Sequence, residues 1–248
     1  YYVNAKVDNW KELLQLNINK MRLADPEDQK EIGSFVPSAP LDPQEMLDEV
    51  FAYANKIHHP EIKALVLKLL KDKSEKLLYW PAARSLHHSV RSGLLYHLVR
   101  MARTAEMLKR VYSGLDSDLL YAGVLLHDIS KIGELEADEL GFSEYSKEGQ
   151  LLGHLVMGVK EIEIAGRQLG ISDEVILLLE HLVASHHYEP EYGSPKKPLF
   201  LEAELLHYID LIDARVYDYE EALKNTDRGD FSEPVWSLEK RKLYKVNL

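Results

Sequence analysis

Histidine and aspartate side chains interrupt several strongly apolar stretches of this sequence. The pair His127-Asp128 follows directly on the apolar run from Leu119 to Leu126, so we expect both side chains to be buried or nearly so. Burying such a pair without partners costs on the order of a few kcal/mol. Imidazole and carboxylate ligands together suit zinc, manganese or iron, whereas carboxylate ligands alone suit magnesium. The pair therefore predicts a hydrogen-bonded role or a divalent-metal site.

Several other predicted helices carry a polar break in an otherwise apolar face. The breaks are His97, His154, the pair His186-His187, and the aspartates Asp210 and Asp213, which share a helix face. Helical bundles build metal sites in this way, with each helix pointing one ligand into the core. A lone histidine on such a face is more often a core residue than a ligand, so the prediction depends on the whole set. The pattern does not choose between the two adjacent histidines. Other histidines are assigned to structural or surface positions: His58, His59, His181 and His207.

The composition is that of an ordinary globular protein, with 46% hydrophobic and 29% charged residues in a chain of 248. The absence of cysteine excludes disulfides, thiolate zinc sites and cysteine nucleophiles. No apolar segment approaches the ~20 residues needed to span a bilayer, and no signal-peptide pattern opens the chain, so we expect a cytoplasmic protein with no membrane partner. Because the net charge is −11, we expect a local basic patch or bound metal ions to attract any polyanionic substrate.

The pattern of side chains divides the chain into four zones. Residues 1–33 alternate as strands do, 34–43 are a proline-containing linker, 44–225 have helical periodicity, and 226–248 form a C-terminal extension. Asp42-Pro43-Gln44-Glu45 is a capping box with proline at the first helical position, so a helix is predicted to begin there. Further helices are predicted from Pro60 and over 90–112, 117–131, 150–169, 173–187 and 199–224. The predicted fold class is mainly α, with a short N-terminal β segment.

The order of these residues resembles the HD superfamily of metal-dependent phosphohydrolases. Leu126-His127-Asp128-Ile129-Ser130-Lys131-Ile132 is similar to the central signature of that superfamily, and Ile209-Asp210-Leu211-Ile212-Asp213-Ala214 is similar to its closing aspartate motif. The resemblance implies an HD-domain helical bundle in which Asp210, not Asp213, is a ligand. The implied divalent-metal ligands are His97, His127, Asp128, His154, His186, His187 and Asp210.

A closer resemblance, covering nearly the whole chain, is to the YhaM-type 3′-5′ exoribonucleases. Three stretches carry it: Pro81-Ala82-Ala83-Arg84, His87-His88 with Ser92 to His97, and Ser185 to Pro195. The resemblance implies that residues 1–33 are the last strands of an OB-fold whose front would precede the first residue, a tyrosine. It also implies single-stranded RNA as substrate, with DNA as a further candidate, and nucleoside 5′-monophosphates as products. Manganese is the expected ion, with Mg²⁺, Fe²⁺, Co²⁺ and Ni²⁺ as alternatives, bound singly or in a pair.

The residues of the central signature also suggest individual roles. Asp128 has two oxygens and is adjacent to His127, so we expect it to bridge two ions where two are bound. Such ions activate water and hold the phosphate oxygens during an in-line displacement. Lys131 lies one helical turn beyond Asp128 and is predicted to stabilise charge on the phosphate; the alternative is an exposed lysine at a helix end. Further substrate-binding predictions fall on His87, His88, Arg91 and Asp213.

Two other functions remain open at this point. The first is hydrolysis of a small nucleotide, such as a nucleoside monophosphate, a dinucleotide or a cyclic nucleotide, by the same kind of site. The second is a nucleic-acid-binding factor whose HD core is only structural. The sequence argues against the second function because no residue of the ordered ligand set is substituted. It predicts neither the number of metal ions nor an oligomeric state.

Overall fold

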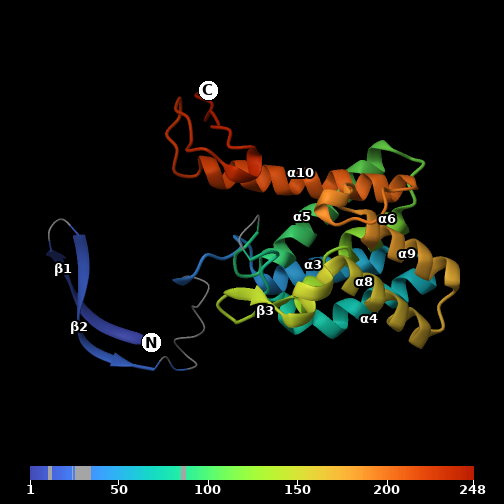
Figure 1. Cartoon of the computed structure of the whole chain (residues 1–248), viewed down its shortest axis with the longest axis horizontal. Helices are drawn as coiled ribbons and strands as arrows, with labels where there is room; N and C mark the ends of the chain where they lie inside the picture. The colour runs from blue at the N-terminus through green and yellow to red at the C-terminus, as the bar shows by residue number, and fades with distance from the viewer. Residues whose placement is uncertain (11–12, 24, 26–34, 85–87) are drawn as a thin grey trace. The chain divides into compact units, whose positions relative to one another are not determined.

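The computed structural model describes residues 1–10, 13–23, 25, 35–84 and 88–248 (Figure 1). The contacts divide the chain into two units, Tyr1–Pro37 and Ser38–Leu248. Each unit is considered by itself.

The first unit is an antiparallel hairpin of β1 (Tyr2–Trp10) and β2 (Leu13–Arg22), with a register shift between Asn4 and Ala5. The alternating pattern had predicted strands here, and the strand pair confirms that prediction. Large apolar side chains of the hairpin are exposed: Val3, Val7, Leu14, Leu16, Ile18 and Met21. A two-stranded hairpin of this kind is marginally stable in water when it stands alone. The origin of the hairpin in an OB-fold stays a prediction.

The second unit is helical, which confirms the predicted fold class. Its helices are α3 (Pro43–Lys56), α4 (Pro60–Leu77), α5 (Gly93–Val111), α6 (Ser117–Leu126), α7 (Lys131–Glu134), α8 (Lys147–Leu169), α9 (Asp173–Ser185) and α10 (Leu201–Leu223). A small hairpin of β3 (Leu135–Ala137) and β4 (Ser143–Tyr145) follows α7, and single 3₁₀ turns lie at Pro190–Tyr192 and Trp236–Leu238. The small hairpin was not predicted, since three-residue strands are too short to show an alternating pattern.

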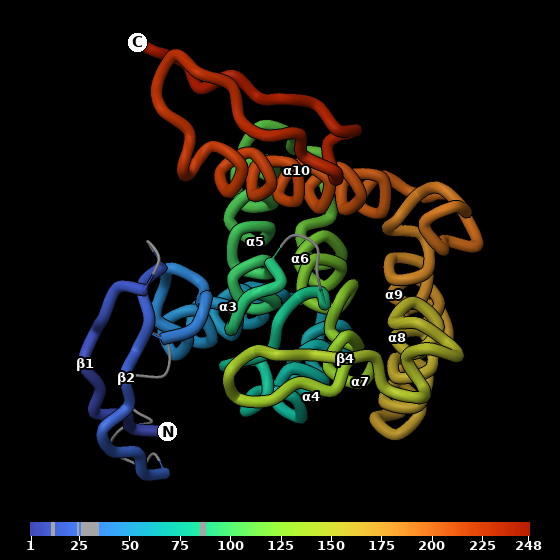
Figure 2. The backbone as a smooth tube through the Cα atoms, turned by 60° about the vertical axis from the view of Figure 1, so that its left-hand side comes forward, coloured from blue at the N-terminus to red at the C-terminus, as the bar shows by residue number. Residues whose placement is uncertain are grey.

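Helix α6 is the centre of the core. It contacts α3, α4, α5, α9 and α10, and Figure 2 shows its tube running between those of α5 and α9. Every residue from Leu120 to Leu126 is buried, which is the pattern of a helix surrounded on all sides by other helices. The residues that directly follow α6 therefore lie in the interior of the unit.

Local caps set the helix boundaries that the sequence had indicated. The carboxylate of Asp42 accepts hydrogen bonds from the backbone N–H groups of Gln44 and Glu45, so α3 begins as predicted. Gly170 ends α8 at φ 68°, in the left-handed conformation that glycine adopts without a steric penalty.

Two predicted boundaries are wrong at places that matter for the site. The helix expected over 173–187 ends at Ser185, before His186 and His187. A single helix was expected over 117–131, but α6 ends at Leu126. The chain then turns through i→i+3 hydrogen bonds, from Ile129 N–H to Leu126 C=O and from Lys131 N–H to Asp128 C=O, before α7 begins. The apolar run continues through Ile129 and Ile132, so side-chain periodicity could not reveal the tightening of the backbone.

The C-terminal extension folds back beside α10. Isolated bridges join Phe231 to Tyr244 and Val235 to Arg241, and the side chains of Leu238 and Leu243 are buried. The extension is therefore packed against the helical unit, and not a loose tail. Among the residues that the structure describes, no helix is long and apolar enough to cross a membrane.

Candidate metal centre

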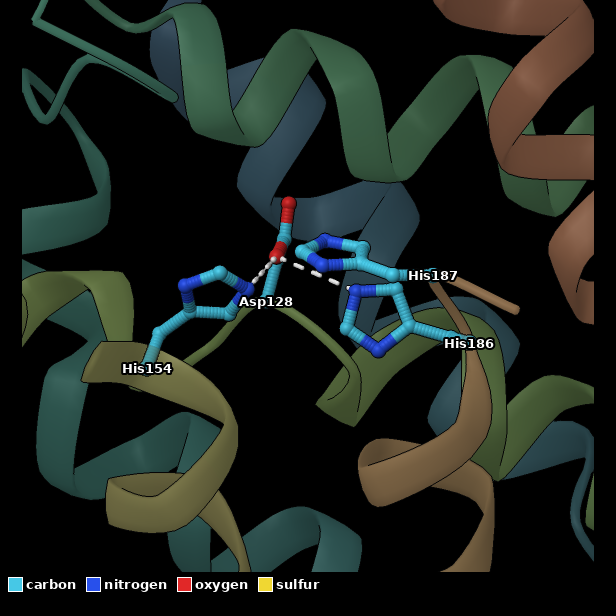
Figure 3. Close-up of side chains that lie close together, drawn as sticks. All are labelled: Asp128, His154, His186 and His187. Carbon is cyan, nitrogen blue, oxygen red and sulfur yellow. Dashed lines mark ion pairs between the residues drawn. The ribbon is translucent and has the colours of Figure 1, made fainter. Parts of the chain in front are cut away.

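Five segments distant in sequence bring their polar side chains together in the helical unit. They are His97 on α5, His127-Asp128 after α6, His154 on α8, His186-His187 after α9, and Asp210 on α10. Potential ligand atoms of these residues form overlapping groups whose members lie within 4.8 Å of one another. One such group, with Asp128, His154, His186 and His187, is drawn in Figure 3. The convergence that the sequence predicted is present in the structure.

The carboxylate of Asp128 lies between two sets of histidines. Its Oδ2 atom is 3.4 Å from Nε2 of His127 and 3.8 Å from Nε2 of His97. Its Oδ1 atom is 3.4 Å from Nε2 of His154 and 3.8 Å from Nε2 of His186, the two ion pairs dashed in Figure 3. Asp210 joins the first set, with Oδ1 3.3 Å from Nε2 of His97. Each oxygen of Asp128 therefore faces a different cluster of nitrogen atoms.

Backbone carbonyls hold three of the imidazole rings by Nδ1. His127 donates to the carbonyl of Val124 at 2.9 Å, and His186 donates to that of Val183 at 2.8 Å. His187 donates to the carbonyl of Tyr192 at 2.6 Å. A carbonyl can only accept, so Nδ1 carries the proton and a neutral ring has its lone pair on Nε2.

Carboxylates hold the other two rings in the same way. Nδ1 of His97 lies 2.7 Å from Asp213, and Nδ1 of His154 lies 3.1 Å from Glu134. All the clustered histidines thus have Nδ1 engaged and Nε2 facing the cluster. Outer partners that orient histidines in this way are typical of metal centres.

Three buried atoms of the cluster lack a hydrogen-bond partner among the described residues. They are Oδ1 of Asp128 and Nε2 of His154 and of His186. An unpaired polar atom in a protein interior costs on the order of 1–3 kcal/mol, and these atoms point at one another. A divalent cation would accept all three as ligands, so the residues fit a metal ion both by position and by donor type.

The charges of the cluster also suit a cation. Burial opposes ionisation of Asp128, but Lys131 and the neighbouring histidines hold its pKa well below the ordinary value. Burial likewise opposes ionisation of Asp210, whose pKa is nevertheless lowered by His97 and His127. Burial lowers the pKa of His186 well below 6.5 and keeps its ring neutral. Ionised carboxylates and a neutral imidazole are the protonation states that bind metal.

The predicted catalytic lysine lies beside the cluster. Nζ of Lys131 is 2.6 Å from Oδ2 of Asp128, and its side chain lines the cavity described below. Burial opposes protonation of Lys131, yet the pKa is raised by Asp128, so the ammonium charge is retained. The alternative of an exposed lysine at a helix end is wrong, since the side chain is only 12% exposed.

The remaining predicted residues lie elsewhere. His88 and Asp213 are buried behind His97, where Asp213 accepts hydrogen bonds from both rings. Arg91 donates to the backbone carbonyl of Glu139. None of these three side chains lines the cavity in the described part of the chain, so their substrate-binding role gains no support. For Asp213 the geometry favours a positioning role instead. His87 lies outside the described residues.

A kink in α8 sets the position of His154. Gly153 has φ 70° and ψ 160°, which interrupts the helix one residue before the histidine. This conformation is accessible almost only to glycine. Oε1 of Glu134 then accepts from the backbone N–H of His154 at 3.0 Å as well as from its ring. One carboxylate therefore caps the restarted helix and orients the ligand.

Part of the cluster lines a cavity of about 510 Å³. Asp128, Lys131, His154, His187 and Asp210 lie at the floor, and Arg84, Tyr145, Tyr192, His207, Arg215 and Ser237 are among the walls. Sequence analysis did not assign any of these wall residues to the site. Arg84 stands in a stretch already singled out for its family resemblance, which was an available signal. For Tyr145 no signal existed, because its neighbours in the cavity are distant in sequence. Arg215 follows the predicted ligand Asp210 on the same helix, and that spacing was an available signal.

The fold and the site define the class of protein. A sequence model of the HD domain matches residues 94–215, a span that begins on α5 and ends on α10 and contains the whole cluster. The helical bundle with His127-Asp128 at its centre is therefore an HD domain.

Comparisons over nearly the whole chain identify the particular family. The chain is 40% identical over 246 residues to the 3′-5′ exoribonuclease YhaM of Halalkalibacterium halodurans, covering 99% of this chain and 76% of the relative. It is 41% identical to YhaM of a Geobacillus species, covering 98% and 74%, and 42% identical to YhaM of Shouchella clausii, covering 98% and 76%. No solved structure matches the chain. The chain belongs to the YhaM family of 3′-5′ exoribonucleases.

Proposed function

We propose that this chain is a metal-dependent 3′-5′ exoribonuclease that hydrolyses the terminal phosphodiester of single-stranded RNA. The observation that carries the proposal is the convergence of imidazole Nε2 atoms and ionised carboxylates beside one cavity. The same activity is named for the relatives at about 40% identity.

The ligand atoms form overlapping groups around Asp128. His97 and His127 face its Oδ2 atom, and His154 and His186 face its Oδ1 atom, with His187 beside them. Asp210 lies near His97 and shares a group with His127 and His186. We assign these seven residues as the metal-holding set. Divalent cations held there supply Lewis-acid polarisation of the phosphate and activation of water at neutral pH. Mixed nitrogen and oxygen ligands favour Mn²⁺ as the ion, with Fe²⁺, Co²⁺, Ni²⁺ and Mg²⁺ as alternatives.

The protein's own side chains complete the chemistry around the phosphate. Lys131 carries a retained positive charge at the cavity floor and stabilises negative charge that develops on the phosphoryl oxygens. Arg84 and Arg215 bring two more cations to the walls, where they attract the phosphates of the substrate. Tyr145 offers an aromatic face on which a base can stack. These groups offset the net charge of −11 where the polyanion must enter.

The size of the cavity favours cleavage at a chain end. A volume of about 510 Å³ lies within the range of pockets that enclose one small organic molecule. It accommodates a terminal nucleotide but not the middle of a folded or double-stranded RNA. The same volume also suits a free small nucleotide, which makes a small-nucleotide phosphohydrolase the second candidate.

A labelled oligonucleotide separates the two candidates. We expect the Mn²⁺-loaded protein to shorten a 5′-labelled single-stranded RNA as a ladder from the 3′ end and to release nucleoside 5′-monophosphates. An intact RNA beside a hydrolysed cyclic nucleotide or dinucleotide would instead establish the second candidate. Asp128→Ala should abolish both hydrolysis and metal retention. The matched control is His58→Ala, because the His58 side chain is 84% exposed and outside the cluster, and this variant should keep full activity.

A further inference from the structure

The C-terminal extension forms one wall of the cavity mouth. Ser237 lines the cavity beside Arg215 of α10. The guanidinium of Arg215 donates to the backbone carbonyl of Ser237 at 3.3 Å and lies 3.4 Å from the carboxylate of Glu239. The match to the HD domain ends at residue 215, so this wall lies beyond the part of the chain that the HD domain explains.

Positive charge is concentrated just beyond that wall. Four basic residues fall within 240–245: Lys240, Arg241, Lys242 and Lys245. The first three are exposed. Lys245 instead donates to the carbonyls of Leu223 and Thr226, at 2.9 and 2.7 Å, and so ties the segment to the end of α10. In a chain with a net charge of −11, this is a local field suited to a polyanion.

Exposed aromatic rings lie within the same segment. Trp236, next to Ser237 in the chain, is 78% exposed, and Nζ of Lys240 lies 4.0 Å from the centre of its ring. Large apolar rings in water are typical of surfaces that stack bases, and alternating rings and cations are the usual surface for single-stranded nucleic acid. We call residues 236–245 the basic-aromatic strip.

The backbone of the strip is held in a demanding conformation. Glu239 and Lys240 have φ of 57° and 60°, so two consecutive non-glycine residues adopt the left-handed region. The turn is closed by the hydrogen bond from Lys240 N–H to Val235 C=O at 2.9 Å, and the buried side chain of Leu238 anchors it. Strain of this kind persists where the surrounding structure enforces it, and it is concentrated at functional sites. The strip is thus a built surface beside the cavity.

We propose that the basic-aromatic strip binds the nucleotides that lie 5′ of the terminal nucleotide, with Trp236 stacking a base and Lys240 and Lys242 contacting phosphates. The proposal rests on the exoribonuclease function proposed above, because only a polynucleotide extends from the cavity across the strip. Arg215 joins the two parts, since its pairing with the exposed Glu239 can be exchanged for a substrate phosphate at the cavity mouth. A small substrate that fills only the cavity does not reach Trp236, Lys240 or Lys242, which are not among the residues that line it.

Substrate length provides the test. We compare Lys240→Gln/Lys242→Gln with the control Lys71→Gln/Lys109→Gln, whose lysines are exposed on α4 and α5 and do not line the cavity. For a 12-nucleotide RNA, two lost phosphate contacts should make the slope of log kcat/KM against log salt shallower by about 1.4 and reduce kcat/KM about 25-fold at 0.1 M salt. Thymidine 5′-p-nitrophenyl phosphate should be hydrolysed at the parent rate by both variants.

The aromatic part is tested in the same assay. Trp236→Ala should lower kcat/KM for the 12-nucleotide RNA by at least about fivefold, and Trp236→Phe should restore most of it, because either ring can stack a base. Equal losses on the small substrate and the RNA, or an RNA salt slope equal to that of the control, would overturn the proposal. So would a change in native mass in the strip variants, which would make the strip a contact between copies of the chain. Because hydrolysis of the small substrate and 3′-end trimming continue in these variants, failure of the strip is distinct from failure of the proposed function.

Discussion

The substitution Asp213→Asn tests whether a residue outside the cavity sets the metal centre. Asp213 is 5% exposed, and its Oδ2 atom accepts from Nδ1 of His97 at 2.7 Å and from Nε2 of His88 at 2.8 Å. Its Oδ1 atom accepts from the guanidinium of Arg100. Burial opposes ionisation, but the hydrogen bonds from His88 and His97 hold the pKa of Asp213 well below its usual range. Asparagine preserves the shape and removes the charge and one acceptor atom.

These contacts set the expected size of the effect of Asp213→Asn on stability and on metal affinity. The amide oxygen can face the two histidines or Arg100, but not both, so at least one charge-assisted hydrogen bond becomes a contact between two donors. That loss costs about 1.5–3 kcal/mol of unfolding free energy. An amide also orients the His97 ring less strongly and makes its Nε2 less basic, and outer partners of metal-binding histidines contribute about 10- to 100-fold to metal affinity. We therefore expect the Mn²⁺ dissociation constant to rise by that factor.

Two measurements separate the effect of Asp213→Asn on stability from its effect on metal affinity. Urea unfolding of the metal-free protein reports the loss of stability, and Mn²⁺ titration followed by electron paramagnetic resonance reports the affinity. The control is Glu220→Gln, which neutralises the other carboxylate that pairs with Arg100, at 2.9 Å, but leaves Asp213 and His97 paired. Glu220 is 59% exposed, so this variant should stay within twofold of the parent in affinity. If Asp213→Asn also binds Mn²⁺ within twofold of the parent, Asp213 does not act through His97.

Three further outcomes follow from the geometry. Gly153→Ala should cost about 1–3 kcal/mol, because φ 70° and ψ 160° are strained for alanine, and it should weaken metal binding by displacing His154; unchanged urea unfolding would refute the kink argument. The hydrogen bond from Tyr121, followed by that from Lys56, lowers the pKa of Glu106 to about 2. This stabilisation is present above the unfolded pKa near 4.5 and is lost as the pH falls toward 2. Glu106→Gln should therefore lower the free energy of unfolding by about 1–2 kcal/mol at pH 7, and by progressively less below pH 4.5, as measured by urea unfolding. A loss of stability that does not change with pH would contradict this expectation. Chelation of divalent ions should stop hydrolysis and lower the melting temperature, both restored by Mn²⁺, since a ligand that binds only the native state stabilises it.

The class of fold and the ordered ligand set were accessible from the sequence for a physical reason. An apolar run such as Leu119 to Leu126 must lie in a core, so the polar pair that follows must have buried partners. That single constraint located the centre of the site. The other ligands followed because each is a polar residue on a face that is otherwise apolar, and the resemblance to HD proteins supplied their order.

The partners that orient the ligands were not accessible in the same way. Glu134 accepts from both the backbone and the ring of His154, twenty residues away. No periodicity relates the two, because the β3–β4 hairpin and the Gly153 kink lie between them. The wall formed by Arg215 and Ser237 depends likewise on how the C-terminal extension folds back on α10. Such contacts arise from tertiary packing, for which local pattern carries no information.

Two of the ligand segments nevertheless follow a local rule that sequence alone could use. Helix α6 ends one residue before His127, and α9 ends one residue before His186. In both, the ring donates to the carbonyl three residues earlier, Val124 or Val183. The last carbonyls of a helix have no intrahelical partner, so the imidazole satisfies one of them and in doing so presents Nε2 away from the helix.

The same contact therefore ends the helix and prepares the ligand. At α9 the ring of His186 takes the place of a backbone donor. The N–H of His187 donates to Oγ of Ser194 at 3.0 Å, which leaves the carbonyl of Val183 to accept from the His186 ring. A local carbonyl fixes the tautomer of a ring held in this way, so no distant carboxylate is needed. His97, within α5, and His154, after the kink, depend instead on Asp213 and Glu134, respectively. Histidines at the ends of buried apolar helices are thus oriented by local structure, whereas those within helices require a tertiary partner.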